Sequence, residues 1–191
     1  MASQIGSMNN VKIFVLYLMK NINYPMDYVT INEVVMQTDY VMYLDFDEAF
    51  HQMLEGALIE ENGKNEHGES LYSVTHKGRL VAEQLKCDIL PSILDKSLTC
   101  ALQYLDFRRR GILVDCESQR LGDQTFDVTV TLKEKDKVIL STTINADSEY
   151  HAVQMKKNFR DRPDVIYRGI LALLSGKVEF LYDTRKDIDP S

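Results

Sequence analysis

The sequence predicts an α+β protein built from two parts, and three patterns support this prediction. Up to Gly111, apolar residues recur mostly every three or four positions, which is the spacing of helices packed on a core. After Gly111 they alternate with polar residues, as in strands with one buried face. Two more helical patterns follow these strands. We therefore expect a largely helical N-terminal part and a C-terminal sheet covered by helices.

The first predicted helix covers Val11 to Ile22. Its main stripe consists of Val11, Phe14, Val15, Leu18 and Ile22, and further apolar residues broaden this stripe round the helix. A helix that is apolar nearly all round is buried on most sides. Pro25 then disfavours helical geometry at Tyr24, so the helix ends before it.

Two short helices are predicted next. Thr30 is expected to cap the first, because Glu33 lies three residues later, where a capping box places its glutamate. Polar residues at 37–39 end that helix. The second begins near Asp45 and ends at Gly56. Its apolar stripe is Phe46, Ala49, Phe50, Met53 and Leu54.

A β-hairpin is predicted over residues 57–75, where two short apolar runs flank a polar segment with two turn-favouring Asn-Gly and His-Gly pairs. The order helix, turn, helix, hairpin predicts a winged helix-turn-helix. A further helix over 75–88 is capped by Thr75. Gly78 in its first turn costs about 1 kcal/mol relative to alanine, which indicates that another part of the chain packs closely there.

The segment Tyr72-Ser73-Val74-Thr75-His76-Lys77-Gly78-Arg79 resembles the end of the wing in many bacterial winged-helix regulators. Together with the apolar segment at 10–19 and with Tyr24-Pro25-Met26, it makes almost the whole chain similar to a Gram-positive bacterial family, catalogued as domain of unknown function four-three-six-four. The resemblance implies a winged helix, a mixed C-terminal domain and a regulator, with no catalytic residues or known ligand. Residues 40–45 depart from the family pattern, which has more threonine and asparagine there.

The next predicted helix runs from Ser92 to Arg110, with Pro91 in the position favoured at a helix start. Its apolar residues at spacings of four, three and four are Leu94, Leu98, Ala101 and Leu105. Such a stripe either packs on the core of its own chain or forms the seam of a dimer. The three arginines at 108–110 either stabilise the helix end or contact an anion.

Three antiparallel strands are predicted over 113–120, 124–132 and 138–145, with a charged turn at 133–137. In the middle strand Phe126, Val128, Val130 and Leu132 share one face. Two helices over 148–159 and 163–174 are expected to cover that face. The second helix carries the apolar stripe Val165, Ile166, Ile170, Leu173 and Leu174. The segment 178–182 has the composition of a short fourth strand, so the sheet has either three or four strands.

These elements group into four parts. Residues 1–90 form the winged helix-turn-helix domain, and residues 91–111 form a linking or dimerisation helix. Residues 112–182 form a C-terminal α+β domain, and residues 183–191 form a loose tail.

Composition narrows the class of protein. The chain has 191 residues, 45% of them apolar and 27% charged, which is typical of a globular protein. No apolar run approaches the roughly 20 residues needed to span a membrane, and the N-terminus lacks the pattern of a secretory signal. Three separated cysteines are typical of reduced thiols. We therefore expect a cytoplasmic protein.

The sequence predicts no enzyme, cofactor or metal site. None of the four histidines lies within three to five residues of another histidine or a cysteine, so the spacing of a zinc site is absent. The glycine-rich phosphate loops, the nucleophile elbow and the zinc-protease motif are absent from the sequence as well.

Charge leaves two functions open. Residues 1–90 hold six Lys and Arg against thirteen Asp and Glu, whereas residues 91–191 hold sixteen of each. The first function is a DNA-binding transcriptional regulator that forms a homodimer and uses its C-terminal domain for dimerisation or sensing. Its candidate DNA contacts are Tyr43, His51, Gln52, Lys64, Lys77 and Arg79. The second is a winged-helix module that binds a basic protein partner, because nucleic-acid affinity depends on Lys and Arg.

Overall fold

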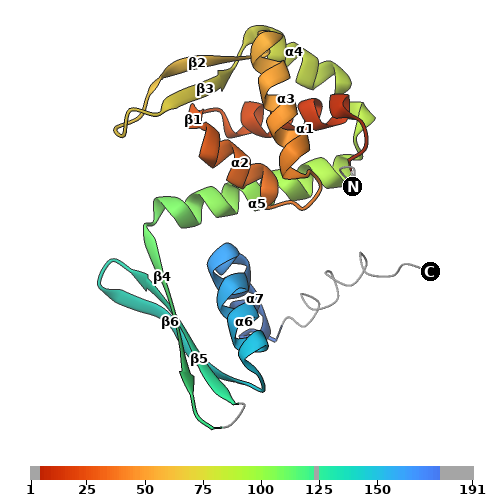
Figure 1. The fold of residues 1–191 in the computed structure, drawn as a ribbon. Coiled ribbons are helices and arrows are strands. Elements are labelled where there is room, and N and C mark those ends of the chain that lie inside the picture. Colours follow the sequence, from red (N-terminus) through yellow and green to blue (C-terminus); the bar gives the residue numbers. More distant parts are fainter. Residues whose placement is uncertain (1–4, 123–124, 177–191) are drawn as a thin grey trace, which may run out of the picture. The chain divides into compact units, whose positions relative to one another are not determined.

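The computed structural model describes residues 5–122 and 125–176. Within these ranges the chain is a mixed α+β protein with seven α-helices and two antiparallel three-stranded sheets (Figure 1). It divides into two compact units, with the boundary between Asp106 and Phe107. Each unit has its own apolar core.

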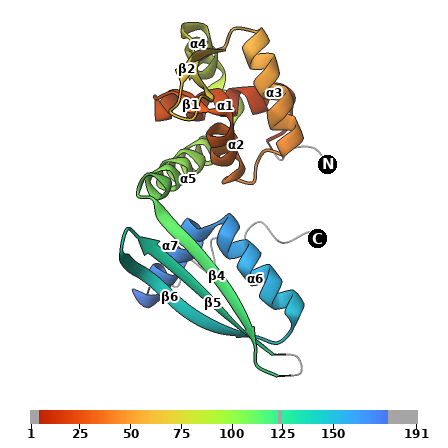
Figure 2. The same cartoon turned by 60° about the vertical axis from the view of Figure 1, so that its left-hand side comes forward.

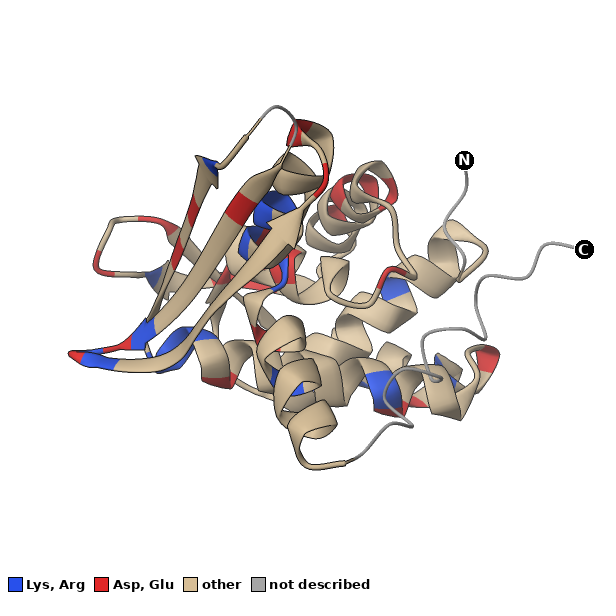
Figure 3. Ribbon diagram, turned by 90° about the horizontal axis from the view of Figure 1, so that it is seen from below, with Lys and Arg blue, Asp and Glu red and all other residues tan. Residues whose placement is uncertain are grey.

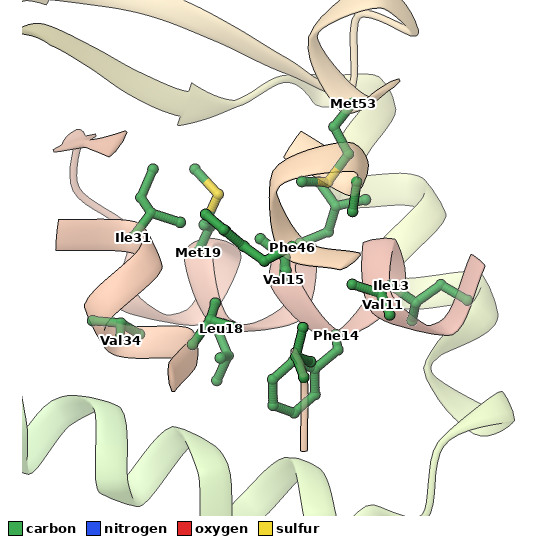
Figure 4. Packing of buried hydrophobic residues seen from close by; sticks show 14 of the residues in the cluster. Val11, Ile13, Phe14, Val15, Leu18, Met19, Ile31, Val34, Phe46 and Met53 are labelled. Atoms are coloured by element: carbon green, nitrogen blue, oxygen red, sulfur yellow. The ribbon is translucent and has the colours of Figure 1, made fainter. Parts of the chain in front are cut away.

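Helix α1 (Met8–Ile22) is the centre of the first unit. It begins earlier than predicted, because Ser7 caps it and accepts a hydrogen bond from the Asn10 amide at 3.3 Å. It ends at Asn23, whose φ is 59°. The residues that the helix buries are Val11, Ile13, Phe14, Val15, Leu16, Leu18, Met19 and Ile22. Figure 4 shows α1 side chains in one cluster with Ile31, Val34, Phe46 and Met53 from other helices.

Helix α2 (Tyr28–Met36) has a different cap from the one predicted. Asp27, not Thr30, lies at the N-cap, and its Oδ1 accepts a hydrogen bond from the Thr30 amide at 2.8 Å. The Thr30 hydroxyl donates to the other oxygen of Asp27 at 2.9 Å. The prediction of Thr30 as cap was wrong because the chain is extended only as far as Asp27, in strand β1 (Met26–Asp27), and turns into the helix directly after it.

Helix α3 (Tyr43–Glu55) begins two residues before the predicted start at Asp45, and Gly56 ends it as predicted. It buries Phe46, Ala49, Phe50 and Met53. The predicted hairpin is present as β2 (Ile59–Lys64) and β3 (Ser70–Val74). The third strand of this sheet, β1, was not predicted; it pairs antiparallel with β3 and gives the order β1-β3-β2.

Helix α4 (His76–Leu85) follows the hairpin and continues as a 3₁₀ turn (Lys86–Asp88). Thr75 caps it as predicted, since its Oγ1 accepts a hydrogen bond from the Gly78 amide at 3.1 Å. The close packing expected at Gly78 is confirmed, because a Cβ at this position would lie 2.1 Å from the carbonyl oxygen of Leu58. The first turn of α4 therefore rests directly on the backbone that leads into β2.

Helix α5 (Pro91–Arg109) carries the predicted apolar stripe. Leu94 and Ala101 are 4% and 0% exposed and belong to the core of the first unit. Leu98 and Leu105 are partly buried against the same core. The stripe therefore packs on the core of its own chain, and its role as a dimer seam stays a prediction.

The second unit contains the sheet β4 (Ile112–Arg120), β5 (Phe126–Glu134) and β6 (Lys137–Ala146), with the strands in this order (Figure 2). The alternation predicted for the central strand is confirmed, because Val128, Val130 and Leu132 are buried. The turn between β5 and β6 is shorter than predicted. Strand β5 continues to Glu134, and Lys135 takes a positive φ of 53°.

Helices α6 (Glu149–Asp161) and α7 (Pro163–Leu174) complete the second unit. Helix α6 packs on the sheet, and α7 packs on α6. The apolar stripe predicted for α7 is only partly buried, because Leu173 and Leu174 are 40% and 81% exposed. The chain places these two leucines in the last turn, past the part of α7 that contributes to the core through Ile166.

The strand predicted over 178–182 and the tail over 183–191 lie outside the described residues. None of the helices that the structure describes combines the length and the apolar character needed to cross a membrane.

Candidate functional site

Helix α3 carries three of the six candidate contacts, Tyr43, His51 and Gln52, and aromatic packing fixes its orientation. The Phe50 ring lies 4.9 Å from the rings of both Tyr28 and Tyr72, edge-on in each case. These contacts tie α3 to α2 and to β3. These contacts therefore determine which side of α3 faces the core and which side faces solvent.

Tyr28 adds a polar contact at the border between these two sides. Its hydroxyl donates a hydrogen bond to Asp47 Oδ1 at 2.7 Å. Burial raises the pKa of Tyr28 well above its usual value, and the hydrogen bond to Asp47 raises it further. The hydroxyl therefore stays protonated and holds the Asp47 carboxylate in place.

The segment that forms α3 and the hairpin carries mostly negative charge. Between Tyr43 and Val74 the chain has eight carboxylates and a single basic side chain, Lys64. The eight are Asp45, Asp47, Glu48, Glu55, Glu60, Glu61, Glu66 and Glu69, and all are exposed or partly exposed. We call this set the α3–hairpin surface, and Figure 3 colours its acidic residues red.

Three apolar residues lie at the N-terminal end of this surface. Met42, Tyr43 and Leu44 are 43%, 52% and 76% exposed, although they follow one another in the chain. The first of the eight carboxylates, Asp45, follows directly after them. An exposed apolar group beside charged residues is typical of an interaction surface.

The structure shows that Gln52, predicted to read a base, is held by neighbouring side chains. Its Oε1 accepts a hydrogen bond from Lys12 Nζ at 3.1 Å, and its Nε2 donates to Glu48 at 2.9 Å. His51 is exposed, with its Nε2 3.7 Å from Asp47 Oδ1. The hydrogen bond from Lys12 could not be predicted from the sequence, because the two residues are 40 positions apart and only the fold brings α1 beside α3.

The other predicted contacts are spread over the hairpin and α4. Lys64 is exposed at the end of β2. Lys77 Nζ donates a hydrogen bond to the Gly56 carbonyl at 2.8 Å, so it stabilises the end of α3. Arg79 Nε donates to the Val74 carbonyl at 3.5 Å and lines a cavity of about 230 Å³. The six candidates thus form no continuous basic patch.

The family model for a domain of unknown function (DUF4364) matches residues 11–174. The chain belongs to this family. No curated protein and no solved structure is similar enough to the chain to count as a match. The family match confirms the resemblance inferred from the sequence.

The described part of this DUF4364 protein contains no group of three or more His, Cys, Asp or Glu side chains that could hold a metal ion. Its cysteines differ in environment: Cys87 is exposed, Cys100 is partly exposed and Cys116 is buried. Burial raises the pKa of the Cys116 thiol, which makes it a poor nucleophile. Hydrogen bonds from Lys20 and Lys86 lower the pKa of the exposed Glu83 to about 2, as expected of a surface ion-pair network.

Proposed function

We propose that this DUF4364 protein is a winged-helix interaction module that binds a basic protein segment through the α3–hairpin surface. The observation that carries the proposal is the charge of this surface, eight carboxylates against one lysine between Tyr43 and Val74. Such a surface attracts Lys and Arg side chains and repels the phosphates of a nucleic acid at close range.

The winged-helix assignment rests on the order of the elements. Helices α2 and α3 are followed by the β2–β3 hairpin, and β1 adds a third strand to the small sheet. This order supports α3 as the counterpart of a recognition helix. Acidic residues on that helix suit a protein ligand better than DNA.

The exposed apolar residues of this chain indicate that the proposed partner carries an apolar residue as well as basic ones. Met42, Tyr43 and Leu44 offer an apolar contact at one end of the acidic surface. Interfaces commonly combine an apolar centre with a charged rim that sets the rate and specificity of association. A segment with an apolar residue beside several Lys or Arg residues fits this chemistry.

The second candidate is the DNA-binding regulator with a dimerising or sensing C-terminal domain. The order of the elements favours it, and the exposed His51 and Lys64 are available for phosphate contacts. For Gln52 to read adenine, it would have to exchange its hydrogen bonds to Lys12 and Glu48 for a base edge.

One titration separates the two candidates. Fluorescence anisotropy measures the binding of the full chain to a Lys/Arg-rich peptide and to random duplex DNA, from about 20 mM to about 300 mM salt. We expect the peptide to bind and its affinity to fall with salt, and we expect no DNA binding at the lowest salt. Affinity for DNA with a steep negative salt dependence, or no peptide binding at low salt, would contradict the proposal.

A matched pair of variants locates the binding surface. The triple variant Glu55→Gln, Glu60→Gln, Glu66→Gln removes three exposed charges from the α3–hairpin surface. The control Asp115→Asn, Glu117→Gln, Glu149→Gln removes three exposed charges from the second unit. We expect the first variant to weaken peptide binding about tenfold or more at low salt, and the control to leave it unchanged. Equal losses in both would mean that only net charge matters.

A further inference from the structure

Strand β6 lies at an edge of the second sheet (Figure 2). Among the described residues its one neighbouring strand is β5, with Phe126 opposite Ala146 at one end and Glu134 opposite Lys137 at the other. Half of the backbone N–H and C=O groups of such a strand point away from the sheet. They form a row of hydrogen-bonding groups that another strand can join.

The sequence of β6 lacks the features that usually protect an edge. From Val138 to Ala146 it contains no charged residue and no proline, and valine, isoleucine and threonine make up most of it. The irregularity in its pairing with β5 is confined to the turn end, next to Lys133. The other edge strand, β4, carries the exposed charges Asp115, Glu117 and Arg120. The two edges therefore differ, and β6 is the one suited to pairing.

We infer that β6 pairs antiparallel with β6 of a second copy of this chain, about an axis at Thr142. In this register Val138 lies opposite Ala146 of the second copy, and no like charges face one another. The same arrangement of β4 about Cys116 would set Asp115 opposite Glu117 and repel. The two sheets become one continuous sheet of six strands.

Pairing in this register also buries apolar side chains that are exposed in the single chain. Leu140 and Ile144 share the face of β6 that looks toward the core, since they pair with Leu132 and Val128 of β5. Ile144 is nevertheless 49% exposed, and Leu140 is only partly buried. Pairing about Thr142 places each Leu140 opposite Ile144 of the other copy, so it extends the apolar face across the joint.

Charge on the second unit does not oppose this association. Residues 107–191 hold fifteen Lys and Arg against fourteen Asp and Glu, a net charge of +1, whereas residues 1–106 hold seven against fifteen, a net charge of −8. The strong negative charge thus belongs to the unit that lacks β6. The inference is independent of the proposed binding of a basic segment, which uses residues of the first unit.

Light scattering coupled to size-exclusion chromatography tests the pairing on the full chain. We expect the molar mass to rise with concentration from 22.0 kDa toward twice that value. In the variant Ser141→Lys, Thr143→Lys, each new lysine lies opposite a lysine of the second copy, so this variant is expected to stay monomeric. In Ser141→Lys, Thr143→Glu, each lysine lies opposite a glutamate, so this variant is expected to dimerise.

The two variants lose the same two side-chain contacts within one chain. Ser141 and Thr143 are exposed, and their hydroxyls contact Thr131 and Thr129 at 3.4 Å and 2.9 Å. Both variants lose these contacts, so circular dichroism and thermal unfolding of the monomers should agree. A wild-type chain that is monomeric up to about 100 µM overturns the inference, as does a dimeric lysine–lysine variant. A monomeric lysine–glutamate variant overturns the register about Thr142.

Discussion

Gly78 shows how much one position depends on its surroundings. In the middle of a helix, alanine is ordinarily the more stable residue by about 1 kcal/mol. At Gly78 we expect the reverse, because a Cβ would lie 2.1 Å from the Leu58 carbonyl oxygen and 2.8 Å from Val74 Cγ1. Neither the backbone before β2 nor the buried valine gives way easily, so glycine allows α4 to approach the hairpin.

The first prediction concerns this residue. Gly78→Ala should lower the free energy of unfolding by about 1–3 kcal/mol, the usual cost of forcing an extra carbon into a packed site. Urea denaturation followed by circular dichroism measures the change. Gln84→Ala, at an exposed position of the same helix, is the control and should stay within about 0.5 kcal/mol of the wild type. A Gly78→Ala chain as stable as this control would show that the close contact is easily relieved.

Single residues of the candidate site were only partly predictable. The sequence identified Gln52 and Lys77 by chemical type, and the structure assigns both to contacts within the chain, with Lys12 and Gly56 respectively. Residue type shows what a side chain can bind, whereas its partners depend on which helices come together. For the same reason the exposed apolar residues at 42–44 became evident only once the core side of α3 was known.

Among the elements, the start of α2 was hard to predict because the sequence offers two N-cap residues close together. Asp27 and Thr30 are both good caps, and the glutamate three residues after Thr30 favoured the latter. The structure uses Asp27, because β1 pairs with β3 and holds the chain extended up to that residue. A strand of two residues has no periodicity to recognise, so β1 and the correct cap were missed together.

The second prediction tests this cap. Asp27→Ala should destabilise the protein by about 0.5–2 kcal/mol, the range measured for lost N-caps. Asp27→Asn retains an oxygen that can accept from the Thr30 amide and should recover most of the stability. Thermal unfolding followed by circular dichroism compares the three chains. If Thr30 were the cap instead, Thr30→Ala would have the larger effect of the two alanine variants.

Longer elements were predicted well because their periodicity extends over many residues. Helices α1, α3 and α5 and strand β5 begin and end within a few residues of their predicted bounds. The apolar stripes predicted for these elements are buried or partly buried. The stripe of α7 is an exception in its last turn, where Leu174 is 81% exposed. An apolar stripe shows which side of a helix favours burial, but it does not show how far along the helix the neighbouring element extends.

On the scale of the whole molecule, charge is divided unevenly. Residues 1–106 have a net charge of −8, and much of it lies on the α3–hairpin surface. Like charges at this density repel one another and destabilise the folded unit at low ionic strength. A bound basic segment would relieve this repulsion, which links the proposed function to stability.

The third prediction follows from this repulsion. The urea midpoint of the wild type should rise when salt is increased from about 20 mM to about 500 mM, because screening weakens repulsion between exposed charges. Glu55→Gln, Glu60→Gln, Glu66→Gln should be more stable than the wild type at low salt by a few tenths of a kcal/mol per charge. It should also respond less to salt. The matched variant of Asp115, Glu117 and Glu149 should respond like the wild type, and a smaller response there would argue against local repulsion.

The kinds of elements, their order and the side that most of them bury were predictable without a structure, because these follow from periodicity and from capping residues a few positions apart. The sequence also determined the charge that separates the two units, since charge is a property of composition. The fold was needed to show that β1 completes the small sheet, that Lys12 holds Gln52, and that β6 is an edge strand among the described residues. These features depend on which distant segments come into contact, and contacts between distant segments arise from packing of the whole core.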